Sequence, residues 1–165
     1  MKVCIIGDGL TSLSLAKNLI NKKISVHIYH KKITGKFLSN RTIGISKNNL
    51  KFFKKEILEV PKKIIWEIKK IEIYSEKLKN NKILNFDDNK KNLFYMIRND
   101  ELYKCLIEEL SKSKLFKKTI ITKESFYNKL LSKNDYDLII NCDQNNPISK
   151  KYFTKKVDKD YKNLA

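Results

Sequence analysis

Arginine, glycine and proline are scarce in this chain, and the scarcity of arginine bears on its partners. The 165 residues hold 36 lysines and arginines against 18 acidic residues, a formal net charge of +18. Such an excess ordinarily suggests nucleic acid or an anionic membrane surface as the partner. However, the only arginines are Arg41 and Arg98, and the lysines form no long uninterrupted run. Because nucleic-acid readers rely on arginine forks, a solvated lysine surface is favoured and a nucleic-acid partner is disfavoured.

The chain also lacks a cysteine framework and a long apolar run. Its three cysteines, Cys4, Cys105 and Cys142, are odd in number and widely separated, which favours reduced, buried thiols over disulfides or a zinc site. No apolar stretch approaches the roughly 18 residues of a membrane span, and Met1 and Lys2 lead directly into a strand without a signal peptide. We expect a cytoplasmic protein without a metal site, and peripheral association with a membrane stays open.

A chain of this length is expected to form one domain, over residues 1–165. A short β-branched run stops at Gly7, apolar residues at helical spacing follow, and a second strand-like run comes next. This alternation predicts an α/β fold, with a parallel sheet whose two faces are both covered. The expected elements are strands near 2–6, 25–29, 118–122 and 136–142, and helices near 10–22, 99–112 and 123–133.

The middle of the chain has a different pattern. Residues 41–53 indicate a turn that runs into a helix, with Leu50 and Phe53 facing inward, and Pro61 ends this segment. Three strand-like runs then follow, separated by polar turns, at 68–75, 82–86 and 92–97. They predict an antiparallel β insert at about 65–97, which leaves the α/β body and returns to it.

The stretch VCIIGDGLTSLSLA at residues 3–16 carries the strongest functional signal. A dinucleotide fingerprint reads G-x-G-x-x-G between a strand and a helix, and here Ser12 takes the third position. Gly7 would permit the tight turn, and Gly9 would let a pyrophosphate approach main-chain N–H groups at the helix N-terminus. A small serine can serve the close packing that the third glycine allows. The predicted nucleotide-binding loop consists of Gly7, Asp8, Gly9, Leu10, Thr11 and Ser12, with the Asp8 side chain pointing away from the phosphates.

The alternative interpretation of this stretch is an ordinary strand–turn–helix with two turn glycines. Glycine occurs only four times in the chain, and two of those four fall at the required spacing after the required strand. This placement favours nucleotide binding.

The end of the second strand departs from the fingerprint. A carboxylate is expected there to hold the ribose hydroxyls, but the position falls on His30, and Lys31 follows it. A histidine can hydrogen-bond a ribose hydroxyl, and the lysine would favour an additional phosphate. An ordinary surface histidine at a strand end is an equally good interpretation.

Four motifs occur in a fixed order along the chain: GDGLTSLSLAKNLI, RTIGIS, RNDELYKCL and DLIINCD. In this order they resemble the N-terminal part of flavin-dependent aromatic hydroxylases, above all the ubiquinone-biosynthesis branch that hydroxylates polyprenylated phenols. The resemblance spans nearly the whole chain and implies a Rossmann-like FAD/NAD(P)-binding sheet, with the antiparallel insert as the start of a substrate domain.

The resemblance also implies roles for residues beyond the glycine turn. Arg41 and Arg98 would lie along the flavin side, and Asp143 would match the first member of an Asp-Gly pair that ends a later strand. Gln144 stands where that glycine is expected, and Asn145 and Asn146 tolerate the left-handed backbone that such a turn needs. A plain strand-ending turn at Asp143 is an equally good interpretation.

The function that the resemblance implies is that of an FAD-dependent monooxygenase, with NAD(P)H as reductant and a phenolic small molecule as substrate. A later Gly-Asp motif of the family does not occur within the 165 residues, so we expect a truncated chain that is inactive alone, or one whose missing half a second protein supplies. No catalytic base can be named. The alternative is a non-catalytic nucleotide-binding or partner-binding module.

Overall fold

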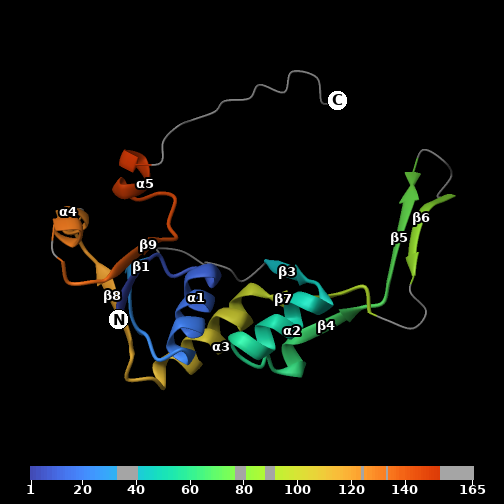
Figure 1. Cartoon of the computed structure of the whole chain (residues 1–165). Coiled ribbons are helices and arrows are strands. Elements are labelled where there is room, and N and C mark those ends of the chain that lie inside the picture. The colour runs from blue at the N-terminus through green and yellow to red at the C-terminus, as the bar shows by residue number, and fades with distance from the viewer. Residues whose placement is uncertain (33–40, 77–80, 88–91, 124, 133, 153–165) are drawn as a thin grey trace.

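The computed structural model describes residues 1–32, 41–76, 81–87, 92–123, 125–132 and 134–152 (Figure 1). Four parallel strands form its main sheet, in the order β8-β2-β1-β9. These strands are β1 (Lys2–Ile6), β2 (Ser25–Lys31), β8 (Phe116–Ile121) and β9 (Leu138–Asn141). The helices around the sheet are α1 (Leu10–Asn21), α3 (Asn99–Ser111), α4 (Ser125–Ser132) and α5 (Pro147–Tyr152). The predicted α/β fold and its parallel sheet are therefore confirmed.

The central strand β1 has both faces covered, as its continuous apolar sequence requires. Side chains alternate between the faces of a strand, so Val3 and Ile5 pack in the cluster that α1 and α3 complete, where Leu13 and Leu106 are also fully buried. Cys4 and Ile6 face the opposite side. There they meet the smaller cluster to which α4 and α5 contribute Tyr127, Leu130 and Ile148.

A second sheet lies beside the first, with the antiparallel order β3-β7-β4. Its strands are β3 (Thr42–Ile45), β4 (Ile65–Ile68) and β7 (Phe94–Arg98), and helix α2 (Lys47–Glu56) and the 3₁₀ turn η1 (Lys62–Ile64) accompany it. Leu50 and Phe53 of α2 pack against the main core, as predicted.

Two short strands of this sheet correct the sequence analysis. Residues 42–45 were expected to form a turn, but they form β3, paired with β7 from Thr42↔Arg98 to Ile45↔Tyr95. Residues 65–68 form β4, where the sequence indicated a strand only from residue 68. Both strands have four residues and take their hydrogen bonds from β7, a partner far along the chain, so local sequence gives them little signal.

Helix α5 was not predicted either, because the sequence indicated only a turn at residues 143–146 and no element after it. The fully buried Asn146 side chain accepts a hydrogen bond from the Ser149 amide at 2.9 Å, and Pro147 takes the first helical position, where a missing N–H costs nothing. Together these two residues start a helix of six residues.

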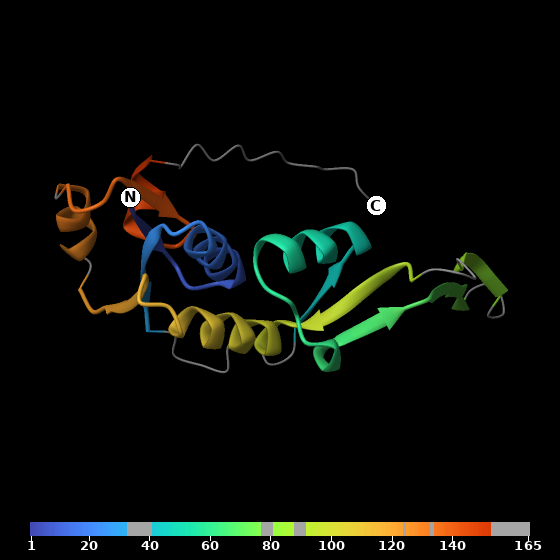
Figure 2. The ribbon, with the colours of Figure 1, turned by 60° about the horizontal axis from the view of Figure 1, so that its bottom comes forward.

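The remaining strands, β5 (Lys70–Ser75) and β6 (Asn81–Asp87), form a hairpin that projects from the body (Figures 1 and 2). Cross-strand pairing places Ile71 opposite Phe86 and Ile73 opposite Leu84, so these four side chains share one face. Ile73 is 43% exposed, and Leu84 and Phe86 are each 48% exposed. The predicted antiparallel insert is present, and its apolar hairpin face is open to solvent.

The prediction of buried thiols holds for Cys4 alone, since Cys105 and Cys142 are only half-buried. All three cysteines are free thiols, and burial raises the pKa of Cys4 to about 12.

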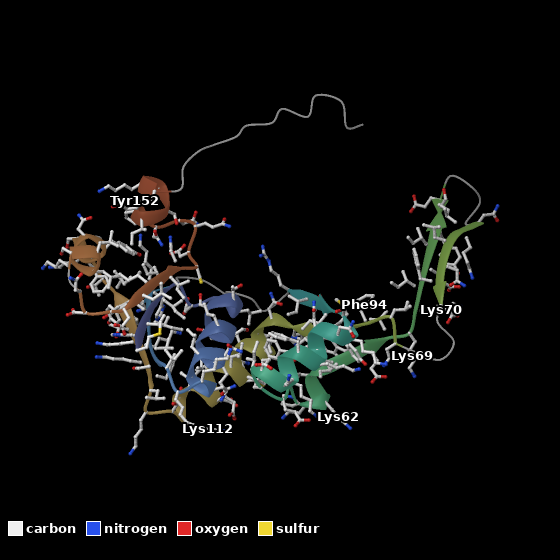
Figure 3. The ribbon with its side chains drawn as sticks, viewed as in Figure 1. Lys62, Lys69, Lys70, Phe94, Lys112 and Tyr152 are labelled. Carbon is white, nitrogen blue, oxygen red and sulfur yellow. The ribbon has the colours of Figure 1, made fainter. Side chains whose placement is uncertain are left out.

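In Figure 3, Lys69 and Lys70 lie together at the start of β5, and Lys62 and Lys112 lie away from them and from each other. Within the described residues, no helix is long and apolar enough to cross a membrane, and no group of His, Cys, Asp and Glu side chains could hold a metal ion.

The exposed hairpin face predicts self-association. Replacing Leu84 and Phe86 together with threonine should lower the apparent mass in gel filtration at high concentration, because it removes exposed apolar surface and keeps β propensity. Asn85→Thr, on the opposite face of β6, is the matched control and should change nothing. An unchanged elution profile for the double variant would show that this face does not mediate self-association.

Candidate functional site

The site lies at the carboxyl ends of β1, β2 and β9, where the chain turns at Gly7. Gly7 has a φ of +103°, a conformation that residues with a side chain rarely adopt. A Cβ on Gly7 would stand 3.2 Å from the Cβ of Asp143 and 3.3 Å from the carbonyl carbon and oxygen of Cys142. The Gly7 amide donates to the Tyr29 carbonyl at 2.8 Å. Only glycine therefore allows β1 to end this close to the end of β9.

Gly9 has the opposite character. It is the N-cap of α1, with an ordinary extended backbone, and a Cβ built on it would meet no atom within 4 Å. No side chain caps this end of the helix, and its first turn carries no acidic residue. The N–H groups at the start of α1 therefore have no side-chain acceptor, and the helix dipole places positive potential there. An anion can approach the backbone at Gly9 without steric hindrance.

Two adjoining pockets open at this edge of the sheet and share a wall formed by Cys142, Asp143 and Gln144. The first has a volume of about 390 Å³ and the second about 590 Å³, within the range of small-molecule sites. The first is lined by Gly7, Asp8, Gly9, His30, Lys31, Cys142, Asp143, Gln144 and Asn145. The second is lined by Thr11, Asn141, Cys142, Asp143, Gln144, Ser149 and Lys150.

The Asp8 side chain is held inside a polar cluster at the rim of the first pocket. Its Oδ2 lies 2.9 Å from Lys118 Nζ on β8 and 3.2 Å from His30 Nδ1 on β2, and it accepts a hydrogen bond from Tyr103 on α3 at 3.1 Å. Burial opposes the charge on Lys118, but hydrogen bonds from its ammonium group to Tyr103 and Asp8 outweigh burial and raise its pKa. The negative charge of Asp8 is thus compensated within the protein.

Two residues of the predicted loop face the core instead of the pockets. Ser12 is almost fully buried, and its Oγ hydrogen-bonds to none of the described residues. Leu10 is half-buried against the main cluster. Ser12 therefore takes the close-packing position predicted for it, and the loop residues that line the two pockets are Gly7, Asp8, Gly9 and Thr11.

The turn after β9 is built by a network of side chains around Asp143. The side-chain amide of Asn146 donates from Nδ2 to Asn141 Oδ1 at 2.7 Å and to the Asp143 backbone carbonyl at 3.0 Å. Ser149 Oγ donates to the same carbonyl at 2.7 Å, and the Asp143 carboxylate accepts from the Asn145 amide at 2.9 Å. The turn therefore forms without the expected glycine. The sequence suggested left-handed backbone at Asn145 and Asn146, but among the described non-glycine residues only Lys23 has a positive φ, and Asn146 supports the turn through its side chain instead. The supporting role of Ser149 was not predicted.

The two arginines line neither pocket. The Arg98 guanidinium forms a two-bond pair with the Asp100 carboxylate, at 3.0 and 2.9 Å, and it also holds the pKa of that carboxyl below its ordinary value, against the opposing effect of desolvation. Arg41 is exposed and precedes β3, and its carbonyl accepts from the Asn99 amide at 2.9 Å. The structure thus gathers the glycine turn, His30, Lys31 and Asp143 at one site, and the arginines are not among the residues that line its two pockets.

Comparison with known proteins gives matches among solved structures. No family model and no curated protein sequence matches the chain. The chain is similar to p-nitrophenol 4-monooxygenase PnpA from Pseudomonas putida DLL-E4, with 14% identity and a TM-score of 0.59 over 72% of this chain and 31% of that one. HpxO from Klebsiella pneumoniae, solved with FAD and uric acid, has 14% identity and a TM-score of 0.56, over 72% and 30%.

A third similar structure is PqsL from Pseudomonas aeruginosa, a probable FAD-dependent monooxygenase, with 12% identity and a TM-score of 0.58 over 73% of this chain and 32% of that one. The chain thus spans about a third of the length of these proteins. At such identities the matches establish the fold. The fold that the sequence resemblance implied, that of FAD-dependent aromatic hydroxylases, is confirmed.

The geometry of Gly7 predicts a specific loss of stability. Gly7→Ala should lower the free energy of unfolding by roughly 1–3 kcal/mol, because it forces alanine into a left-handed backbone and against Cys142. Urea denaturation measures this difference. Gly44→Ala is the control, since a Cβ there meets its nearest neighbour at an ordinary 3.4 Å, and equal losses in the two variants would contradict the assignment.

Proposed function

We propose that this chain binds FAD at the Gly7–Gly9 turn and provides the dinucleotide-binding part of a monooxygenase that acts on an aromatic substrate. One observation carries the proposal: the backbone at Gly9 is open, at an uncapped helix N-terminus, within the fold of FAD-dependent monooxygenases. This arrangement fits a pyrophosphate, which needs close approach to main-chain N–H groups.

The residues around the turn suit the other parts of the nucleotide. Thr11 and the Asp143 turn line the second pocket, and His30 and Lys31 line the first, next to the glycines. When bound, a flavin supplies the oxygen chemistry of hydroxylation, while the protein positions the cofactor and excludes water. NAD(P)H as reductant is part of the proposal.

The substrate proposed is a phenolic ring, and a polyprenylated phenol of the ubiquinone pathway is the specific candidate. The sequence resemblance supports this choice. Among the similar structures, PnpA is a p-nitrophenol monooxygenase and HpxO was solved with uric acid, so aromatic and heteroaromatic small molecules recur on this fold.

Gly9→Val tests the binding site. The variant should lose FAD binding because its side chain would occupy the space that the pyrophosphate needs, while its free energy of unfolding should change by no more than about 1 kcal/mol, the scale of an N-cap change. Quenching of flavin fluorescence on titration measures binding, and urea denaturation measures stability. Gly44→Val, in a strand outside both pockets, is the control for a glycine-to-valine change. Equal FAD affinity in Gly9→Val and the parent would refute the site.

The activity of the 165-residue chain alone is a separate prediction. We expect little or no hydroxylation, because both pockets are open at the sheet edge and a reactive flavin must be shielded from water. The measurement is NAD(P)H oxidation coupled to phenol hydroxylation with added FAD. Stoichiometric product at about 10 per second, an ordinary enzymatic rate, would contradict it. A colourless protein that binds ADP and not FAD would favour a non-catalytic nucleotide-binding module instead.

A further inference from the structure

A third pocket lies apart from the glycine turn, between α2, η1 and strands β4 and β7 of the antiparallel sheet. It has a volume of about 290 Å³, at the lower end of the range for small-molecule sites. None of its lining residues lines either pocket at the Gly7 turn. In Figure 3, Lys62 of η1, which lines it, lies across the molecule from Tyr152 of α5. This is a separate site, and its size suits a compact ligand.

One part of the lining is apolar and is called the floor here: Leu50 of α2, Val60, Ile65 of β4 and Tyr95 of β7. Val60 is only 6% exposed, and the other three side chains are half-buried. Leu50 and Ile65 also pack against the main core. The floor therefore offers apolar surface that a ligand can remove from water, and the core holds it in place.

The other part of the lining is charged, and all four of its side chains are exposed. Lys54 and Glu59 form an ion pair with each other, so their charges are compensated. Lys62 and Glu67 have no ion-pair or side-chain hydrogen-bond partner among the residues that the structure describes. The pocket thus presents one positive and one negative charge that a ligand can pair.

These two charges decide which class of ligand fits. A ligand with a carboxylate alone would attract Lys62 but would bring a like charge to Glu67, and a simple amine would have the reverse conflict. A zwitterion satisfies both charges at once. An α-amino acid carries its carboxylate and its ammonium on one carbon, with its side chain on the same carbon for the floor. The long, flexible lysine stem allows the Lys62 ammonium to reach the carboxylate.

We propose that this pocket binds an α-amino acid with an aromatic or branched aliphatic side chain. The carboxylate pairs with Lys62, the ammonium pairs with Glu67, and the side chain lies on the floor of Leu50, Val60, Ile65 and Tyr95. The inference is independent of the proposed function, because the two sites have no lining residue in common.

The binding test titrates ¹⁵N-labelled protein with L-phenylalanine and follows the amide signals by NMR. At the usual ligand efficiency, a compound of this size should bind with a Kd on the order of 1 mM, and the signals of Val60 and Tyr95 should move. N-acetyl-L-phenylalanine lacks the ammonium and L-phenylalanine amide lacks the carboxylate. Each should bind about fivefold more weakly, the upper value of an exposed ion pair. Glycine should not bind, since it has no side chain to bury.

Two variants assign the charges. Glu67→Gln should weaken L-phenylalanine binding about fivefold and should not weaken binding of the N-acetyl derivative, whereas Lys62→Gln should do the same for L-phenylalanine and spare the amide. Exchange of the two charges, Lys62→Glu together with Glu67→Lys, should restore part of the affinity because a zwitterion can turn around. Lys63→Gln is the matched control, since Lys63 is exposed and does not line the pocket.

The outcomes separate this inference from the FAD site. Absence of shifts at Val60 and Tyr95 with L-phenylalanine at about 10 mM, well above the expected Kd, overturns the pocket as an amino-acid site. Equal affinities for L-phenylalanine and its two derivatives, or an equal loss in Lys63→Gln, overturn the recognition of a zwitterion. Gly9→Val should bind L-phenylalanine as the parent does, whatever its affinity for FAD.

Discussion

The close approach of Gly7 to the end of β9 is the contact on which the site depends. Gly7, at the end of β1, lies so close to the residues after β9 that a Cβ on it would stand within 3.3 Å of atoms of Cys142 and Asp143. The left-handed backbone at Gly7 also turns the chain into α1. The N-terminus of α1, the Asp143 turn and the end of β2 then meet at one edge of the sheet. A side chain at position 7 would strain the backbone and press against Cys142 and Asp143, whereas a side chain at position 9 would enter open space.

The sequence could predict the parts of the fold that depend on local pattern. The buried run of β1, the apolar stripe of α1 and the glycine spacing between them all lie within some 20 residues, and each was found. By contrast, β3 and β4 are short strands whose hydrogen bonds come from β7, and their local sequences do not distinguish them from turns. Helix α5 depends on Asn146, whose buried network with Asn141 and Ser149 is visible only in three dimensions.

The same limit applies to the electrostatics of the site. From sequence, Asp8 was only a residue that must point away from the phosphates. In the structure it pairs with Lys118, 110 positions along the chain, because β8 lies beside β2 in the sheet and Tyr103 of α3 completes the cluster. Spacing in the sequence carries no information on such a contact. The cluster also distinguishes Lys118, which is paired with Asp8 beside the first pocket, from the lysines that lie on the open surface.

The two larger sheets share one apolar core, whereas the two-stranded β5–β6 sheet stands outside it, and this difference bears on the site. Val3 and Ile5 of the parallel sheet, Ile97 of β7, and Leu102 and Leu106 of α3 belong to one apolar cluster. The antiparallel sheet therefore shares the core on which the candidate site is built, and α3, which follows β7 directly, also carries Tyr103 to Asp8. The β5–β6 hairpin contributes nothing to this cluster, so its exposed apolar face can change while the Gly7 turn and the His30 ring stay in place.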